Sequence, residues 1–184
     1  MTTKRMTLCA FFTILYVLGA KLVIPVGIIP LTMQTMVVIL AGMLLKPKDI
    51  FLSYAVYFLM GLVGLPVFAS GGGLQYVLQP SFGFLLSFPF AACLISILKS
   101  KFALHSFVSI FPVCLLALLF IYVIGCSYMY IIFNFYMGSA KDIATVISLG
   151  ATPFVLSDAI SSALACVAAL YMVKSKQVQR LLTC

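Results

Sequence analysis

Acidic residues are almost absent from this sequence. Of 184 residues none is Glu, and only Asp49, Asp142 and Asp158 are acidic; charged residues of both signs make up 8% of the chain and hydrophobic residues 65%. A soluble domain is about 45–50% apolar, so a single water-surrounded core has no use for this excess. The composition predicts an all-α integral membrane protein, because helices satisfy their own backbone hydrogen bonds in lipid.

Residues and motifs typical of catalysis are also scarce. The chain has one histidine, His105, and no G-x-x-x-x-G-K-[ST], H-E-x-x-H or G-x-S-x-G pattern. Its six cysteines include no C-x-x-C pair, and most lie in apolar runs, where a free thiol behaves as a small hydrophobic side chain. We therefore predict a protein that is not an enzyme and that has no metal site and no cofactor. Any work driven by ATP would need a separate chain.

Six apolar stretches are candidates for membrane-spanning helices, since about 20 mostly apolar residues cross a bilayer. They lie at about 6–24, 32–46, 49–64, 82–98, 103–125 and 152–173. The aromatic run YMYIIFNFYM at 128–137 fits an outer aromatic belt or a lid-like segment. We expect residues 1–184 to form a single membrane domain, a six-transmembrane-helix bundle in which an outward-facing pocket binds a ligand.

The basic residues lie in clusters between the apolar runs. With six spans and an internal N-terminus, nine of the eleven cations fall on the inner side: Lys4, Arg5, Lys46, Lys48, Lys99, Lys101, Lys174, Lys176 and Arg180. Only Lys21 and Lys141 fall outside. This bias predicts a multi-pass protein of the cell membrane with both termini in the cytoplasm. The net charge of +8 is dispersed rather than gathered into one patch, so we expect no nucleic-acid partner.

Asp158 lies inside the last predicted span, where an acid at the centre of a membrane helix costs about 2.5–3.5 kcal/mol. Ser161 and Ser162 follow at i+3 and i+4, so they share its face of the helix. Two interpretations are open. Asp158 either stabilises a helix-packing seam, bonded to Lys21 or to nearby amides, or it belongs to a ligand site. An ionised carboxylate only accepts hydrogen bonds, so such a ligand would present N–H groups.

Residues 65–84 contain no charge, three consecutive glycines and two prolines. Glycine allows positive φ and close approach of the backbone to another surface, so we expect this segment to fold over the helices and cap a pocket. The candidate substrate-binding residues are Asp158, Ser161, Gln34, Phe68, Gly71, Gly72, Gly73, Gln75, Tyr76 and Gln79. The predicted pocket would hold a small, mostly apolar molecule with a few hydrogen-bonding groups.

Five short segments form a recognisable series. They are PLTMQT at 30–35, GMLLKPK at 42–48, GLPVFA at 64–69 followed by Gly71–Gly73, QPSFGFL at 79–85 and PFVLSD at 153–158. Together they resemble motifs of the BioY family, the biotin-binding S components of energy-coupling factor (ECF) transporters; GLPVFA is the most specific. The resemblance implies six membrane helices, high-affinity capture of biotin in an outward-opening pocket, and as partners a membrane T component and ATPase subunits.

The resemblance also implies that Asp158 and the loop after the third span help build the biotin site. The sequence departs from the family pattern at Ser161, where the family commonly has lysine, and at Gln79, where it has glycine. The missing lysine removes a charge partner for Asp158 or for the carboxylate of biotin. Lys21 or Lys141 could replace it from the outer side.

Three other functions stay open at this point. The chain could be an S component for another vitamin or small molecule, as Ser161 allows. It could be a membrane-embedded enzyme or redox protein that uses Asp158 or the cysteines, although the scattered cysteines and single histidine disfavour this. It could also be a structural bundle in which Asp158 only joins helices.

Overall fold

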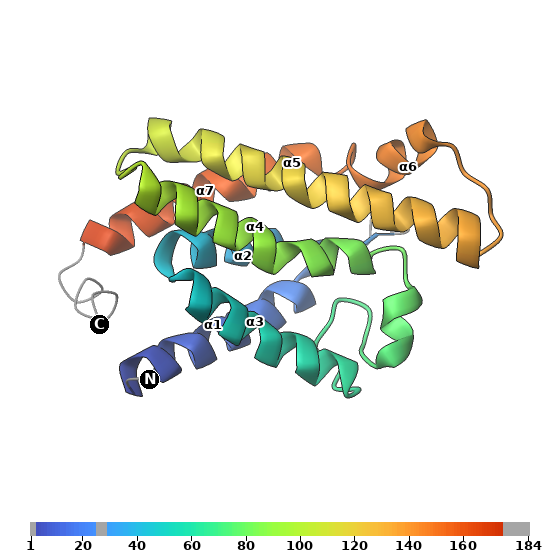
Figure 1. The fold of residues 1–184 in the computed structure, drawn as a ribbon, viewed down its shortest axis with the longest axis horizontal. Coiled ribbons are helices and arrows are strands. Elements are labelled where there is room, and N and C mark those ends of the chain that lie inside the picture. The colour runs from blue at the N-terminus through green and yellow to red at the C-terminus, as the bar shows by residue number, and fades with distance from the viewer. Residues whose placement is uncertain (1–2, 25–28, 175–184) are drawn as a thin grey trace.

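The computed structural model describes residues 3–24 and 29–174, and most of these residues are helical. The longer helices run roughly along the long axis of the molecule (Figure 1). The helices are α1 (Thr3–Lys21), α2 (Gln34–Leu44), α3 (Pro47–Leu62), α4 (Phe82–Lys101), α5 (Phe107–Ile131), α6 (Ile143–Gly150) and α7 (Val155–Lys174). Two short strands, β1 (Val23–Ile24) and β2 (Leu31–Thr32), pair antiparallel after α1, with Val23 opposite Thr32.

Each of the six predicted ranges overlaps one of the longer helices, and short α6 is the additional one. Within the described residues, three segments are long and apolar enough to cross a membrane: Phe82–Lys101, Phe107–Tyr136 and Val155–Val173. The α2 helix has only 11 residues. The six-span count therefore stays a prediction, while the mostly helical, membrane-embedded class agrees with the structure.

The helix predicted at 103–125 begins and ends later than expected. It starts at Phe107, runs to Ile131 and continues as a π-helical segment, Ile132–Tyr136. Part of the predicted belt or lid is thus an extension of α5. The physical reason is local: no glycine or proline interrupts residues 126–137, and the chain turns only at Gly138, with φ +61°.

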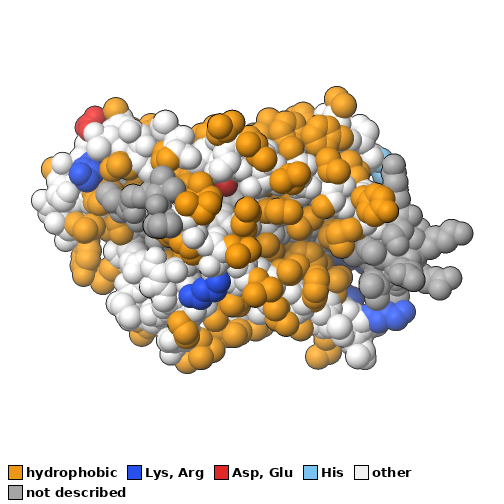
Figure 2. Space-filling model, turned by 180° about the vertical axis from the view of Figure 1, so that it is seen from behind, with side chains coloured by type: hydrophobic (Ala, Val, Ile, Leu, Met, Phe, Trp, Pro, Cys, Tyr) orange, Lys and Arg blue, Asp and Glu red, His pale blue; other side chains and the backbone are white. Residues whose placement is uncertain are grey.

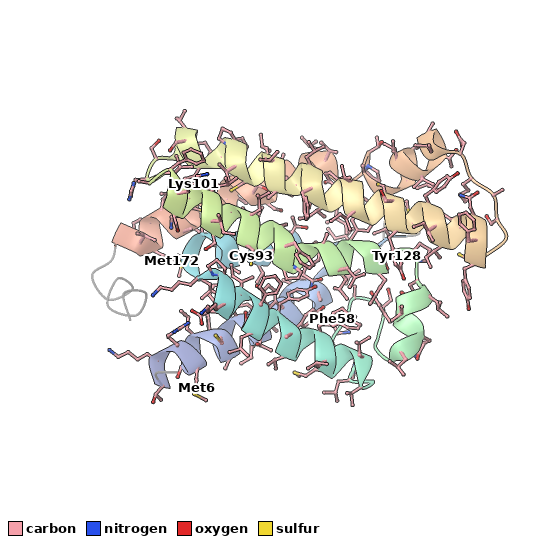
Figure 3. All side chains as sticks on the ribbon, in the orientation of Figure 1. Met6, Phe58, Cys93, Lys101, Tyr128 and Met172 are labelled. Atoms are coloured by element: carbon pink, nitrogen blue, oxygen red, sulfur yellow. The ribbon has the colours of Figure 1, made fainter. Side chains whose placement is uncertain are left out.

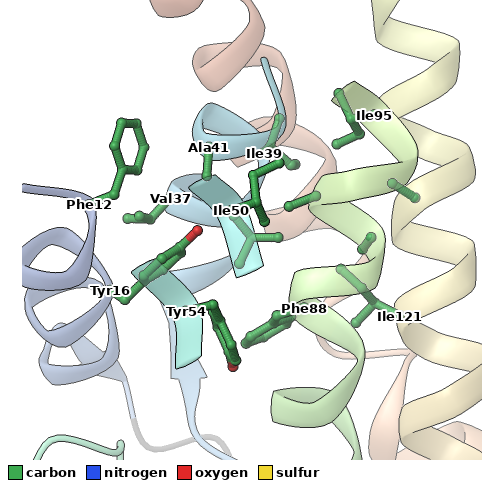
Figure 4. Close-up of a cluster of buried hydrophobic side chains, with 14 of the residues drawn as sticks. Phe12, Tyr16, Val37, Ile39, Ala41, Ile50, Tyr54, Phe88, Ile95 and Ile121 are labelled. Atoms are coloured by element: carbon green, nitrogen blue, oxygen red, sulfur yellow. The ribbon is translucent and has the colours of Figure 1, made fainter. Parts of the chain in front are cut away.

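The core of the bundle is aromatic where α1, α3 and α4 meet. Tyr16 and Tyr54 pack edge to face with ring centroids 5.2 Å apart, and Phe88 lies beside Tyr54 in Figure 4. The Tyr54 hydroxyl donates to the Leu85 carbonyl over 2.7 Å. At Gly42 an added Cβ would lie 2.7 Å from the carbonyl oxygen of Ala92, so glycine lets α2 approach α4 closely.

The two ends of the bundle differ in charge. Met6, Lys101 and Met172 lie toward one end, whereas Tyr128 lies toward the other (Figure 3). The basic turns that flank α1, α3 and α4 gather at the first end, and Lys21 closes α1 away from it. Hydrophobic side chains spread over the described part of the face in Figure 2, and Lys and Arg occupy few places on it. This distribution is typical of a membrane protein with polar ends.

An ion pair joins α1 to α3 near the basic end. The Arg5 guanidinium donates to both oxygens of Asp49, with Nη2–Oδ1 at 2.6 Å and Nε–Oδ2 at 3.3 Å. The side chain of Asp49 is only 8% exposed, against 29% for Arg5. A little further along the same seam, the Thr13 hydroxyl donates to the Ser53 carbonyl over 2.9 Å. These bonds fix the register of α1 on α3.

Candidate ligand-binding site

Asp158 lies in the first turn of α7, next to α5. Its side chain is 9% exposed, and the Tyr122 hydroxyl of α5 donates to Oδ2 over 2.6 Å. The positive end of the helix dipole favours a carboxylate in a first turn, so burial there costs less than at the centre of a membrane helix. One carboxylate oxygen is thus held by a neighbouring helix, and Oδ1 can accept a further donor.

Two small cavities lie side by side in the interior of the bundle. The first, which we call the Asp158 cavity, has a volume of about 50 Å³; its own lining residues are Thr35, Ile121, Tyr122, Gly150, Phe154 and Asp158. The second, the Gln34 cavity, has a volume of about 60 Å³; its own lining residues are Gln34, Ala69, Tyr76, Ser81 and Leu85. Both are lined by Ile29, Pro30, Thr32, Phe84 and Phe88. Shared walls make them two compartments of one site.

The Gln34 cavity contains an unused hydrogen-bond donor. The Gln34 side chain, at the start of α2, is 3% exposed, and its Nε2 has no hydrogen-bond partner among the described residues. A buried amide without a partner costs about 1–3 kcal/mol, so such groups are rare in folded proteins. Two acceptors suit this donor: the Tyr57 hydroxyl, which also lacks a partner and lies near Gln34, and the oxygen of a ligand in the cavity.

Three of the predicted site residues line these cavities: Asp158, Gln34 and Tyr76. Tyr76 lies in the short 3-10 helix Leu74–Leu78, which the loop after α3 brings over the bundle. Burial raises the pKa of Tyr76, so its phenol stays a neutral donor. The fold thus brings together residues that are 42 and 82 positions apart, counted from Gln34 to Tyr76 and from Tyr76 to Asp158.

The other predicted residues support the loop or lie beside the site. Phe68 is fully buried, with its ring 4.7 Å from the Tyr76 ring, so it positions Tyr76 from behind. Exposed Gln75 donates from Nε2 to the Gly72 carbonyl over 3.0 Å. Neither Gln79 nor Ser161 lines a cavity. Their contact with a ligand remains a prediction.

The backbone geometry of the glycine triplet, Gly71–Gly73, shows why glycine is needed in this loop. Gly71 and Gly73 have φ of +122° and +103°, values that other residues rarely adopt. An added Cβ at Gly72 would lie 2.1 Å from the carbonyl oxygen of Leu65. None of the three lines a cavity, so the triplet shapes the loop that presents Ala69 and Tyr76 to the Gln34 cavity.

Several lining residues were missed by the sequence analysis. Thr35 and Tyr122 line the Asp158 cavity, and Phe84 and Phe88 line both cavities. The one sequence feature that could have identified Thr35 is its position directly after Gln34. Tyr122 lies in the uniformly apolar helix α5, where periodicity distinguishes no face, so only the packing of α5 against α7 shows its role.

Lys21 is not the partner of Asp158. Its ammonium donates to the Phe68 carbonyl over 2.8 Å and thereby fastens the loop to the end of α1. The helix-packing interpretation, in the form that paired Asp158 with Lys21, is therefore wrong. The bond to Tyr122 does join two helices, and a cavity lies beside it, so the part of Asp158 in ligand binding remains a prediction.

A much larger hollow lies in a different place. An open groove of about 690 Å³ runs between α5, α6 and the start of α7, lined mainly by apolar side chains such as Leu119, Val123 and Ile147. These three side chains are about half exposed. In a bilayer, a groove of this kind faces lipid, and it lacks the convergent polar groups that fix a ligand. Size alone therefore does not identify the site.

Comparison with solved structures defines the class. The bundle is similar to the S component for biotin from an ECF-type ABC transporter, with a TM-score of 0.84, 25% identity and coverage of 99% of each chain. The architecture is that of a transporter S component. More particularly, this chain belongs to the BioY family, whose pattern it matches over residues 1–178.

Curated relatives agree with this assignment. A probable biotin transporter BioY from Lysinibacillus sphaericus is 35% identical over 89% of this chain and 85% of its own length. The biotin transporter BioY of Thermotoga maritima is 35% identical over 96% of this chain and 99% of its own. A further relative named probable biotin transporter BioY, from Pyrococcus horikoshii, is 34% identical over 92% and 96%. The family resemblance found in the five sequence segments is confirmed.

Proposed function

We propose that this protein captures biotin in the membrane and delivers it to an ATP-driven energy-coupling module. The observation that supports this best is the pairing of a buried acceptor, Asp158, with a buried free donor, Gln34, across two adjoining cavities. The ureido ring of biotin offers two N–H donors and a carbonyl acceptor. Asp158 and Thr35 would bind the N–H groups, and the apolar side chains would surround the ring and tail.

Binding requires the two cavities to merge. At about 50 and 60 Å³ each has room for one or two waters, whose share of liquid volume is about 30 Å³. Ligand pockets are typically about 300–1,000 Å³. Phe84 and Phe88 line both cavities, and rotation of these rings would join the compartments. Because the joined volume is still below that range, the loop that carries Tyr76 would also have to move outward to admit biotin.

We propose that the site opens to the outside and that both termini are cytoplasmic. The supporting feature is the basic end of the bundle, where the start of α1, the α2–α3 turn and the end of α4 lie together. The positive-inside rule supports a cytoplasmic position for that end. The loop that ends in the 3-10 helix Leu74–Leu78 would then cap the site on the external side.

The chain contains no P-loop pattern, so its energy source would be a partner. We propose a membrane T component and ATPase subunits in that role, consistent with the ECF-type transporter from which the structural relative comes. An uptake assay in cells with and without these subunits tests this: accumulation of labelled biotin should need them. Equal accumulation without them would show that the protein transports alone.

The ligand is tested directly on purified protein. Mass spectrometry of extracted ligand, followed by binding of labelled biotin to the emptied protein, should give biotin at a single site per chain. Saturable binding of riboflavin or thiamine without binding of biotin would instead support the alternative, an S component for another vitamin. The absence of binding by any of them, in protein that unfolds cooperatively, would favour a purely structural bundle.

A further inference from the structure

The two cavities have an unusual charge balance for a site that is to bind an acid. Among the described residues that line them, Asp158 is the one charged group, and none is Lys, Arg or His. The described lining of the site is therefore negative or neutral.

The nearest candidates for a cation have other partners. The ammonium of Lys21 donates to the Phe68 carbonyl, and Lys141 lies with Nζ 5.4 Å from the centroid of the Phe133 ring. Neither lysine lines a cavity. Position 161, three residues after the acid, is a serine and lies outside both cavity walls.

This charge balance disfavours a ligand carboxylate. Moving a carboxylate from water into an apolar interior is strongly unfavourable unless a cation or several donors receive it. The negative charge of Asp158 in the adjoining cavity adds repulsion. An ester or amide of the same acid meets neither penalty, because it has no charge to desolvate.

The donors that are present are neutral. Gln34 offers Nε2, and the hydroxyls of Tyr76 and Ser81 lie in the same wall. Such groups donate equally to the carbonyl oxygen of an acid, an ester or an amide. They lack the extra strength that a charged donor gives to a carboxylate.

From these observations, and on the basis of the proposed function, we infer that this site does not select the free carboxylate of biotin: it binds the ureido ring at Asp158 and accepts uncharged tails. Its substrate class is biotin together with its neutral amides and esters. Biotin is attached to proteins through an amide, so the class includes fragments that hydrolysis of biotinylated proteins would supply.

The test compares biotin, biotinamide and biotin methyl ester on the purified full-length protein by competition with labelled biotin, at low and high salt. We expect biotinamide and the methyl ester to bind as tightly as biotin or more tightly, because each tail receives the same neutral hydrogen bonds and the two neutral tails avoid the desolvation of a carboxylate and its repulsion from Asp158. We also expect little effect of salt on their ratio, because no ion pair is involved. A preference for the free acid of about tenfold or more would overturn the inference, since a charged donor is then needed to explain it.

Two variants locate the cause. Gln34→Met should weaken biotin and biotinamide by the same factor, about three- to tenfold, if the buried amide donates to the ureido carbonyl that both compounds share. Lys21→Met, at an exposed position, should leave the ratio of the two constants unchanged. A wild-type preference for biotin that disappears in Lys21→Met would assign the carboxylate to Lys21 and refute a neutral tail site. If none of the three compounds binds, the proposed function itself fails, which is a distinct outcome.

Discussion

Replacing Asp158 by asparagine removes the one charge among the described lining residues of the two cavities and keeps almost the same shape. The asparagine carbonyl oxygen can still accept the Tyr122 hydroxyl, which now lies 2.6 Å from Oδ2. What is lost is the charge that, in the proposed function, strengthens hydrogen bonds donated by the ureido N–H groups. The substitution therefore separates two roles of Asp158, joining α5 to α7 and binding a ligand.

The size of the effect follows from the strength of the bonds. A hydrogen bond to a charged group contributes about 1.5–3 kcal/mol and a neutral one about 0.5–1.5 kcal/mol. The difference, about 1–1.5 kcal/mol, corresponds to about five- to twelvefold in dissociation constant, since about 1.4 kcal/mol is tenfold. We expect biotin to bind Asp158→Asn roughly tenfold more weakly.

Although Asp158→Asn should bind biotin more weakly, its folded state should be as stable as that of the wild type or more stable. Asp158 is 9% exposed and faces no cation among the described lining residues. Removing a buried charge of this kind is often neutral or stabilising. Thermal unfolding of the empty variant should therefore occur at the wild-type temperature or slightly above it. A loss of affinity without a loss of stability is the signature of a residue retained for binding.

The assay is titration with labelled biotin in detergent or lipid discs, alongside thermal unfolding. Asp142→Asn is the matched control: it makes the same chemical change at an exposed acid before α6, whose carboxylate accepts the Thr145 hydroxyl. That control should bind biotin as the wild type does. If Asp158→Asn also binds as tightly as wild type while folding normally, the ligand-binding role of Asp158 is refuted, and its bond to Tyr122 is its purpose.

Three further predictions concern the scaffold. Arg5→Met should lower the thermal unfolding temperature more than Asp49→Asn. The first variant leaves the buried Asp49 carboxylate without a partner, whereas in the second the freed Arg5 side chain can extend to water. The reverse order of the two unfolding temperatures would contradict this explanation. Gly72→Ala should lower the free energy of unfolding by about 1–3 kcal/mol and weaken biotin binding, because the alanine Cβ would overlap the Leu65 carbonyl. Unfolding and affinity equal to those of the wild type would show that the loop adapts freely. Copper phenanthroline should join Cys114 of α5 to Cys166 of α7, whose sulfurs lie 3.2 Å apart; peptide mass spectrometry that finds both thiols free would exclude this proximity.

The sequence predicted the helices well and their ends less well. Apolar runs longer than any core needs placed each of the longer helices, and Pro47 after Lys46 marks the start of α3 as proline at a first helical position should. The end of α5 was misplaced because an aromatic run gives no sign of whether it stays helical. In the structure it does so through Ile131 and then as a π-helical segment.

For the candidate site, the sequence pointed to residues whose burial without a partner is energetically unfavourable, and it missed residues whose burial is not. Asp158 and Gln34 were predicted because a charge or an amide in an apolar chain needs a partner. Tyr122 and Phe88 were not, because a tyrosine or phenylalanine in an apolar helix is equally suited to lipid, core or ligand. Positive φ was correctly expected within the glycine triplet, where Gly71 and Gly73 adopt it, but the sequence did not show that the triplet lies outside the cavity wall.

The sequence by itself determined two things, the surroundings of the protein and its family. A chain with so few charges needs lipid around it. Short motifs are local in the sequence, so their order along the chain identifies the family without the tertiary structure. The tertiary structure alone decided which side chains share a cavity and which cations are absent from it. From the sequence, Lys21 was a candidate partner for Asp158. In the structure Lys21 donates to the Phe68 carbonyl, and the hydroxyl of Tyr122 from another helix donates to Asp158. Partner choice depends on how helices rotate and pack, and that arrangement follows from the whole core rather than from the spacing of any two residues.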